Sequence, residues 1–526
     1  MVTPATEIES RSNAAEVRAV ARVWWVTLLA CAIAIGVQAG FSPLSDPDLP
    51  SHLAIGRWIV EQARVPYTEP FAWTRAGEPY FAYSWLMQVV FYGIMRLAGP
   101  VGLHLLASAI AIAITLAAAA SARALGSSAA AATTYGVASA VIAMIATPFL
   151  RPQLVMFALV PVSWLAVARA RSAADENYAW LAVLFISNAI AAATHISFPV
   201  MAASLVLLAP DRGEPTSSRT WRIVAATGVG WLASPYAGSW LQVFRLNFAS
   251  NVLTRPPALS GEMSPGFVIS PLVGACLAAL PLIALFRVRA ARERAIYGAM
   301  WLVGLIAFAR MFKGIGPWWW CSTPLCVAAL RCLPSASSQS TRRIFAGLLV
   351  ALVAAQSITN VRLYSTLSRL EGDELRRTLP SMRAYAAEPA ARWLERNIRA
   401  GTNGRLLTVF NYGSYLEWRL PSLSPSIDGR TIFPDSAASP DAIGEQGPAR
   451  EGPWQSADLA IVPEGYPVAS RLNADSGWVH VGDSERAPWG STAPRAGLWV
   501  RRAWWARAGS PTASLPSAPL TLQASP

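Results

Sequence analysis

The sequence predicts a polytopic α-helical membrane protein that ends in a small, water-soluble α+β domain. Of the 526 residues, 54% are hydrophobic and only 14% are charged, whereas an ordinary soluble domain has about 25% charged residues. Long apolar runs follow one another up to residue 362, and most of them approach the length that crosses a bilayer. This composition excludes a plain cytosolic enzyme, a secreted disulfide scaffold and a disordered chain.

The apolar runs predict about eleven transmembrane helices, at roughly 20 residues per crossing. They cover residues 23–40, 84–98, 101–120, 129–149, 153–168, 178–209, 222–242, 266–286, 295–310, 315–331 and 344–361. The run 178–209 is too long for one straight helix and is interrupted by Thr194-His195 and Pro199. It forms either one broken helix or two short ones. The second alternative adds a crossing, so it reverses the side of the membrane predicted for every later loop.

The charges of the loops predict the orientation in the membrane. Residues 363–526 hold 17 arginines and 16 acidic residues, so most of the net charge of +13 belongs to the membrane half. Four arginines crowd residues 287–294, which places that loop in the cytoplasm. Counting spans outward puts the N-terminus inside and residues 41–82, 243–265 and the tail outside. Arg169 and Arg171 then fall in an outer loop, against the rule. Positive charge between spans is an orientation signal, so no nucleic-acid partner is expected.

The predicted domains are a cytoplasmic segment 1–22, a transmembrane domain 23–362 whose first outer loop is 41–82, an extracytoplasmic α+β domain 363–508 and a disordered tail 509–526. The α+β domain is expected to hold a helix and five short strands, separated by Pro and Gly. The helix is expected over 380–399, and the strands over 405–410, 415–419, 458–462, 477–481 and 497–501. The last stretch is rich in Ser, Pro and Ala, which is typical of disorder.

The five cysteines lie in or beside apolar runs and form no CxxC pair. We therefore interpret them as small apolar side chains rather than as a metal or redox site.

The first outer loop contains the most informative residues. Asp46 and Asp48 stand where the first span emerges, and Pro50 favours the start of a helix that Asp48 caps. A carboxylate at the water–lipid boundary can accept a proton from a hydroxyl group or hold a divalent cation, so the need for a metal stays open. His52 follows Asp48 by four residues, on the same face of such a helix. From the residues alone, capping and function are equally good interpretations of the two aspartates.

The stretch 46–99, which begins Asp-Pro-Asp-Leu-Pro-Ser-His-Leu-Ala-Ile-Gly-Arg-Trp, resembles the start of a bacterial family of large membrane proteins. That family is similar to GT-C glycosyltransferases, the group that includes protein mannosyltransferases and the aminoarabinose transferase. Its pattern is roughly D-P-D-x-W-x-H-L-x-x-G-x-W-I. The resemblance implies a GT-C-like fold and an acidic catalytic base in this loop. It also implies a polyprenyl-phosphate-linked sugar as donor, used on the outer face of the bacterial inner membrane.

Carried over by position, Asp46 and Asp48 match the acidic pair, His52 matches the histidine, and Arg57 the position before Trp58. The resemblance thus implies Asp46 and Asp48 as catalytic residues and His52 and Arg57 as substrate-binding residues. The family's D-P-F-S-x-T element reads Glu69-Pro70-Phe71-Ala72-Trp73-Thr74 here, and its H-E-W-L element reads Tyr83-Ser84-Trp85-Leu86. The loss of that His-Glu pair favours a member that keeps the fold without the activity.

Further candidates for substrate binding lie outside this loop. Arg310 and Lys313 precede Trp318-Trp319-Trp320 at a predicted outer boundary, where two cations can hold a lipid-linked phosphate. The three tryptophans read as an interfacial aromatic belt. Glu262 occupies the position of a family acidic residue. Asp428 and Arg430 belong to an Asp-Gly-Arg element of the tail, for which a structural turn is the better interpretation.

The first functional hypothesis is a GT-C-type transferase that moves a sugar from the polyprenyl phosphate to a glycan, lipid or protein acceptor of the envelope. The alternative is a non-catalytic membrane protein that binds a glycolipid or assembles polysaccharide. A flippase or transporter is the third hypothesis, because His195 lies in the interrupted run 178–209.

Overall fold

The structure is a computed structural model, and it divides the chain into two compact units. The described residues are 4–42, 44, 46, 48–147, 150–172, 178–208, 218–246, 281–282, 284–286, 288, 291–310, 315–331, 343, 346–351, 353–355, 358, 387–428, 453–485, 495–509 and 514–523. The membrane unit comprises Met1–Ser42, Val101–Trp240 and Thr254–Leu370. The loop–tail unit comprises Pro43–Pro100, Leu241–Leu253 and Glu371–Pro526.

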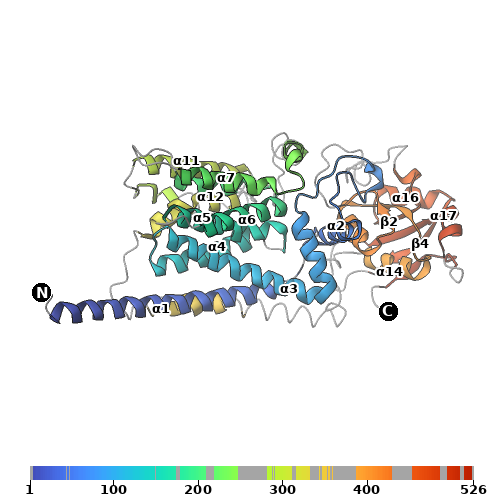
Figure 1. Ribbon diagram of the computed structural model, residues 1–526. Helices are drawn as coiled ribbons and strands as arrows, with labels where there is room; N and C mark the ends of the chain where they lie inside the picture. The colour runs from blue at the N-terminus through green and yellow to red at the C-terminus, as the bar shows by residue number, and fades with distance from the viewer. Residues whose placement is uncertain are drawn as a thin grey trace. The chain divides into compact units, whose positions relative to one another are not determined.

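The membrane unit is helical (Figure 1). Its described elements are α1 (Pro4–Gly40), α3 (Trp85–Ala124) from Val101 onward, α4 (Ala129–Ala146), α5 (Pro152–Ser172), α6 (Tyr178–Thr194), the 3₁₀ helices η2 (Phe198–Leu208) and η3 (Ala237–Ser239), α7 (Ser218–Leu232), α11 (Ala291–Arg310) and α12 (Ile315–Arg331). Among the described residues, four helices are long and apolar enough to cross a membrane: Ala21–Gly40, Trp85–Ala124, Ala129–Ala146 and Pro152–Ser172. The expected number of about eleven spans stays a prediction.

Two apolar segments differ from simple spans. The runs 84–98 and 101–120 form two helical segments, both within the bounds of α3, and the helix is interrupted between them where Gly99 takes a non-helical φ of 61° and Pro100 follows it. The run 178–209 breaks into α6 and η2. At the break, the Nδ1 atom of His195 accepts the backbone N–H of Ser197 at 3.1 Å. Both stretches are therefore interrupted, the first at Gly99 and the second at His195.

The tryptophans of α12 lie inside the membrane unit. Trp318 and Trp320 are each 1% exposed, and Trp319 donates its indole N–H to Ser139 of α4 at 3.0 Å. Tyr135 of α4 stacks on Trp319 with 5.2 Å between ring centroids. The expected interfacial belt is therefore wrong for these residues, because they pack against helices of the same unit rather than facing a lipid headgroup.

The tail folds around a six-stranded mixed sheet in the order β2-β1-β3-β5-β4-β6. The strands are β1 (Gly404–Thr408), β2 (Leu423–Pro425), β3 (Leu459–Pro463), β4 (Trp478–Ser484), β5 (Ala496–Arg501) and β6 (Leu520–Leu522), and the helices are α14 (Ala387–Asn397), α15 (Phe410–Arg419), α16 (Pro467–Ala474) and α17 (Arg502–Ala508), with a 3₁₀ turn η10 (Pro453–Gln455). β1 pairs in parallel with β2 and β3, whereas β5 pairs antiparallel with β3 and β4. The α+β class expected of this domain agrees with these elements.

Two expectations for the tail are wrong. The expected strand 415–419 lies in α15, a helix that is buried on almost every side and so lacks the alternation of an amphipathic helix. The stretch 509–526 was expected to be disordered, but Leu520–Leu522 form β6, which pairs in parallel with β4. The expected helix 380–399 begins at Ala387 among the described residues.

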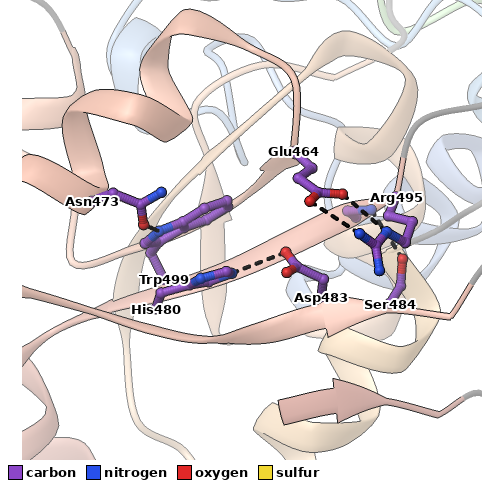
Figure 2. A network of polar contacts seen from close by, with 8 residues as sticks. Glu464, Asn473, His480, Asp483, Ser484, Arg495 and Trp499 are labelled. Carbon is purple, nitrogen blue, oxygen red and sulfur yellow. Dashed lines mark hydrogen bonds and ion pairs between the residues drawn. The ribbon is translucent and has the colours of Figure 1, made fainter. Parts of the chain in front are cut away.

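A polar network joins β4, β5 and α16 on one face of the sheet (Figure 2). The indole N–H of Trp499 donates to the Oδ1 atom of Asn473 at 2.7 Å, and the His480 ring stacks on Trp499 with 4.5 Å between centroids. The Nε2 atom of His480 lies 2.9 Å from the Oδ1 atom of Asp483. These contacts hold the β4–β5 pair together across the irregularity between His480 and Gly482.

Candidate active site in the first outer loop

The two aspartates of the first outer loop make different contacts at the start of helix α2 (Leu49–Gln62). Asp46 is fully buried, and its Oδ1 atom accepts the backbone N–H of Asp48 at 3.2 Å. The Asp46 carbonyl accepts the N–H of Leu49 at 3.2 Å. Asp48 occupies the N-cap position, but its side chain makes no capping hydrogen bond. Asp46 therefore shapes the turn, whereas the half-buried carboxylate of Asp48 stands at the helix N-terminus without serving as the cap.

Helix α2 packs closely on the first part of α3. The Nδ1 atom of His52 lies 3.2 Å from the amide nitrogen of Gln88, which donates to it because an amide N–H₂ accepts no hydrogen bond. A Cβ atom added to Gly56 would stand 2.1 Å from the backbone carbonyl oxygen of Gln88. His52 and Gly56 of the family-like pattern thus both contact Gln88. These contacts set the distance between α3 and α2, the helix that follows the acidic turn.

Arg57, the next residue of α2, binds the tail. Its Nη2 atom donates to the Glu417 carbonyl at 2.9 Å and its Nη1 atom to the Trp418 carbonyl at 3.1 Å. The guanidinium carbon lies 4.7 Å from the centroid of the Trp418 ring. Burial lowers the pKa of Arg57, and the neighbouring Glu61, Tyr92 and Glu417 oppose that change. The group remains a cation, because an arginine guanidinium stays charged in proteins.

A second part of the loop contacts the tail near Asp428. The 3₁₀ turn η1 (Trp73–Arg75) follows the Glu69-Pro70-Phe71 segment. Thr74 donates its hydroxyl to the Ser426 carbonyl at 2.5 Å, and the Trp73 indole donates to the Leu406 carbonyl at 3.4 Å. Asp428, two residues after Ser426, is fully buried. The loop and the Ser426–Asp428 segment therefore meet within one unit.

Glu69 serves a structural purpose at the position of the family's aspartate. Its Oε1 atom accepts the backbone N–H groups of Phe71 at 2.9 Å and Ala72 at 3.0 Å. The side chain is 8% exposed. A shorter aspartate can close such a turn in the same way, so this departure from the family pattern preserves the local structure.

We expect Glu69→Ala to destabilise the protein by about 1–3 kcal/mol, because two buried amides lose their acceptor. Glu69→Gln keeps an oxygen acceptor at the same place and should cost less. Thermal unfolding of the purified protein measures both. Glu78→Ala is the matched control, since the Glu78 side chain is 50% exposed and pairs only with Arg75 among the ion pairs of the described residues. Equal loss for Glu69→Ala and Glu78→Ala would contradict this role.

The remaining predicted residues are not joined to this group by the described structure. Glu262, Lys313 and Arg430 lie outside the described residues, and Arg310 ends α11 with a side chain that also lies outside them. Within the described part of the chain, no three His, Cys, Asp or Glu side chains come together as metal ligands. The residues that the structure does bring into one unit are Asp46, Asp48, His52, Arg57 and Asp428.

Gln88 and the pair Glu417-Trp418 are not among the residues predicted from the sequence. Gln88 lies on α3, four residues after Ser84 of the family-like pattern, and that pattern does not mark it as the partner of His52. Trp418 lies about 360 positions from Arg57, and no local pattern can reveal such a contact.

The fold is similar to those of solved structures. The chain is similar to the arabinofuranosyltransferase AftD from Mycobacteria, with a TM-score of 0.56 and 17% identity over 92% of this chain and 40% of that one. It is also similar to the oligosaccharyltransferase of Archaeoglobus fulgidus, with a TM-score of 0.55 and 12% identity over 91% of this chain and 74% of that one. No protein-family model and no curated protein matches the sequence.

Both neighbours are membrane glycosyltransferases of the GT-C fold. The resemblance expected from the first outer loop is therefore confirmed for the fold, and the chain is a membrane protein built on a GT-C-like scaffold. It spans about two fifths of the length of the arabinofuranosyltransferase. Since one fold can host several activities, the similarity describes the scaffold and leaves the reaction to be argued from the residues.

Proposed function

We propose that the protein is a membrane glycosyltransferase that transfers a sugar from a polyprenyl-phosphate donor to an envelope acceptor on the non-cytoplasmic face of the bacterial inner membrane. The observation that carries the proposal is the placement of Asp48. The residue is half-buried at the N-terminus of α2, and its loop belongs to the same compact unit as the tail. The GT-C-like fold supports this role, because the family resemblance implies an acidic catalytic base in the first outer loop.

In the proposed reaction, Asp48 accepts the proton of an acceptor hydroxyl while that oxygen attacks the anomeric carbon of the donor sugar. A new glycosidic bond forms, the bond between the anomeric carbon and the phosphate oxygen breaks, and polyprenyl phosphate leaves with the bonding electrons. Arg310 and Lys313 are candidates, on the sequence alone, for binding a lipid-linked phosphate. Asp46 keeps the Asp48 backbone in position through the hydrogen bond to its amide.

We propose one orientation in the membrane for this reaction. If α3 crosses once and α6 and η2 cross separately, about eleven crossings remain, and Arg169 and Arg171 at the end of α5 move to the cytoplasmic side. The conflict with the positive-inside rule then disappears. The first outer loop and the tail fall on the same outer side, in keeping with their membership of one compact unit.

Thiol labelling tests this orientation. Ala76 and Ser172 are both exposed, and each can be replaced by cysteine. A membrane-impermeant thiol reagent added to intact spheroplasts should label Ala76→Cys and leave Ser172→Cys unlabelled until the membrane is opened. The native protein gives the background from its own five cysteines. Labelling of Ser172→Cys in sealed cells would contradict the proposed path.

The second candidate function is a non-catalytic protein that binds a glycolipid or assists polysaccharide assembly. Ser84 favours it, because this buried serine stands where the related family has a glutamate. Proteoliposomes given a mixed pool of polyprenyl-phosphate sugars and an envelope extract separate the two functions. A transferase consumes one donor and adds a sugar-sized mass to an acceptor, as mass spectrometry would show. A binding protein retains a glycolipid through purification and forms no product.

A further inference from the structure

We infer that Arg57 is a positioning residue that clamps the catalytic loop onto the tail through helix α15, rather than a ligand of the donor phosphate. The inference rests on the proposed function, because it assigns a role in placing Asp48. It differs from the sequence-based expectation that Arg57 binds substrate.

The geometry of the clamp matches the chemistry of a guanidinium group. Two of its nitrogen atoms donate to consecutive carbonyls, those of Glu417 and Trp418, at the C-terminal end of α15. The last carbonyls of a helix lack partners within the helix and carry the negative end of its dipole. The flat face of the group covers the Trp418 ring at 4.7 Å. A lysine cannot reproduce this combination of two forked donors and a stacked plane.

The tail side of the clamp is itself anchored. Arg419, the last residue of α15, forms an ion pair with Glu395 of α14 and lies 3.6 Å from Glu388 of the same helix. Trp418 also receives Tyr92 of α3 edge-on, with 6.2 Å between ring centroids. The final turn of α15 therefore contacts α14, α2 and the first part of α3. The surface that Arg57 binds is held in place by α14 and by Tyr92.

The clamp can control Asp48 because α2 is a short rigid rod. Asp48 and Arg57 lie nine positions apart, which is about 13 Å along a helix. Between them, His52 and Gly56 contact Gln88 of α3. If the Arg57 end loses its hold, the helix can tilt about the Gln88 contact and displace the carboxylate at its other end. A displacement of about 1 Å at a reacting group can lower a rate about 10²-fold.

The test compares Arg57→Gln, Arg57→Lys and Trp418→Leu in the full-length protein reconstituted in proteoliposomes. We expect kcat to fall by about 10- to 100-fold for Arg57→Gln, with the KM for the polyprenyl-phosphate donor unchanged. Trp418→Leu should lower kcat as well, and combining it with Arg57→Gln should add little, since both act on one clamp. Arg57→Lys should fall between the wild type and Arg57→Gln.

Arg64→Gln is the matched control. It removes the same charge from the same loop, but Arg64 lies just after the end of α2, is exposed, and stands over Trp58 of that helix, 5.7 Å from the ring centroid. It should keep the wild-type kcat. A rise in donor KM for Arg57→Gln at constant kcat, with Trp418→Leu behaving as the wild type, would overturn the inference and return Arg57 to phosphate binding.

Hydrogen–deuterium exchange separates this inference from the proposed function. Amides of α2 should exchange faster in Arg57→Gln and Trp418→Leu than in the wild type and in Arg64→Gln. That result, together with no sugar transfer by the wild type, would keep the clamp and refute the transferase. Unchanged exchange in both clamp variants would refute the clamp, whatever the activity.

Discussion

Replacing Asp48 with asparagine is expected to abolish sugar transfer while the protein stays folded. The carboxylate is the proposed base, and general-base catalysis contributes about 10²- to 10⁴-fold to a rate. Asparagine has nearly the same size and shape as aspartate and keeps an oxygen acceptor, so α2 should stay intact. Transfer measured by mass spectrometry in proteoliposomes gives the loss, and the thermal unfolding temperature gives the integrity of the fold.

Asp46 provides the contrast that makes the Asp48 result specific. Its Oδ1 atom accepts the Asp48 amide, and the amide oxygen of an asparagine can do the same. Asp46→Asn should therefore keep most of the transfer activity, whereas Asp46→Ala should lose part of it together with about 1 kcal/mol of stability. If Asp46→Asn is inactive and Asp48→Asn is active, the two roles are reversed.

Gly56→Val is the second change with a large expected effect. An added Cβ atom would stand 2.1 Å from the Gln88 carbonyl oxygen and 2.9 Å from the Tyr92 Cβ atom. Backbone atoms cannot move aside as a flexible side chain can, so α2 must separate from α3. We expect a loss of about 3 kcal/mol from overpacking, and a fall in kcat of about 10²-fold because Asp48 moves with its helix.

Gly93→Ala controls for the loss of glycine itself. Gly93 lies on α3, and nothing stands within 4 Å of a Cβ atom added there. Alanine is a better helix former than glycine by up to about 1 kcal/mol, so this variant should be at least as stable as the wild type. Thermal unfolding of the two variants side by side checks the argument, and an equal destabilisation would contradict it.

The membrane scaffold and the acidic loop could be predicted from the sequence because their signals are local. Hydropathy over about 20 residues marks a span, and an aspartate before proline marks the start of α2. The two misread segments show where local signals fail. Helix α15 is buried almost all round, so its residues lack the period that identifies a helix. Strand β6 is defined by its pairing with β4. The sequence of Leu520–Leu522 alone does not predict that pairing.

The candidate site could be predicted only in part, because its decisive contacts are long-range. The pattern around His52 and Gly56 marked these positions without showing that both contact Gln88. The role of Arg57 depends on carbonyl groups about 360 residues away. Backbone carbonyls carry no sequence signature, so a pattern could flag the arginine but could not distinguish a clamp from a phosphate ligand.

The most direct test of the central claim is donor consumption by proteoliposomes of the wild type and of Asp48→Asn, supplied with the same polyprenyl-phosphate sugars and envelope extract. The proposal predicts that the wild type releases polyprenyl phosphate from one donor and adds its sugar to an acceptor. It predicts neither product from the equally well-folded variant. Transfer at the wild-type rate by Asp48→Asn would contradict the proposed base, and no donor consumption by folded wild-type protein would contradict the transferase.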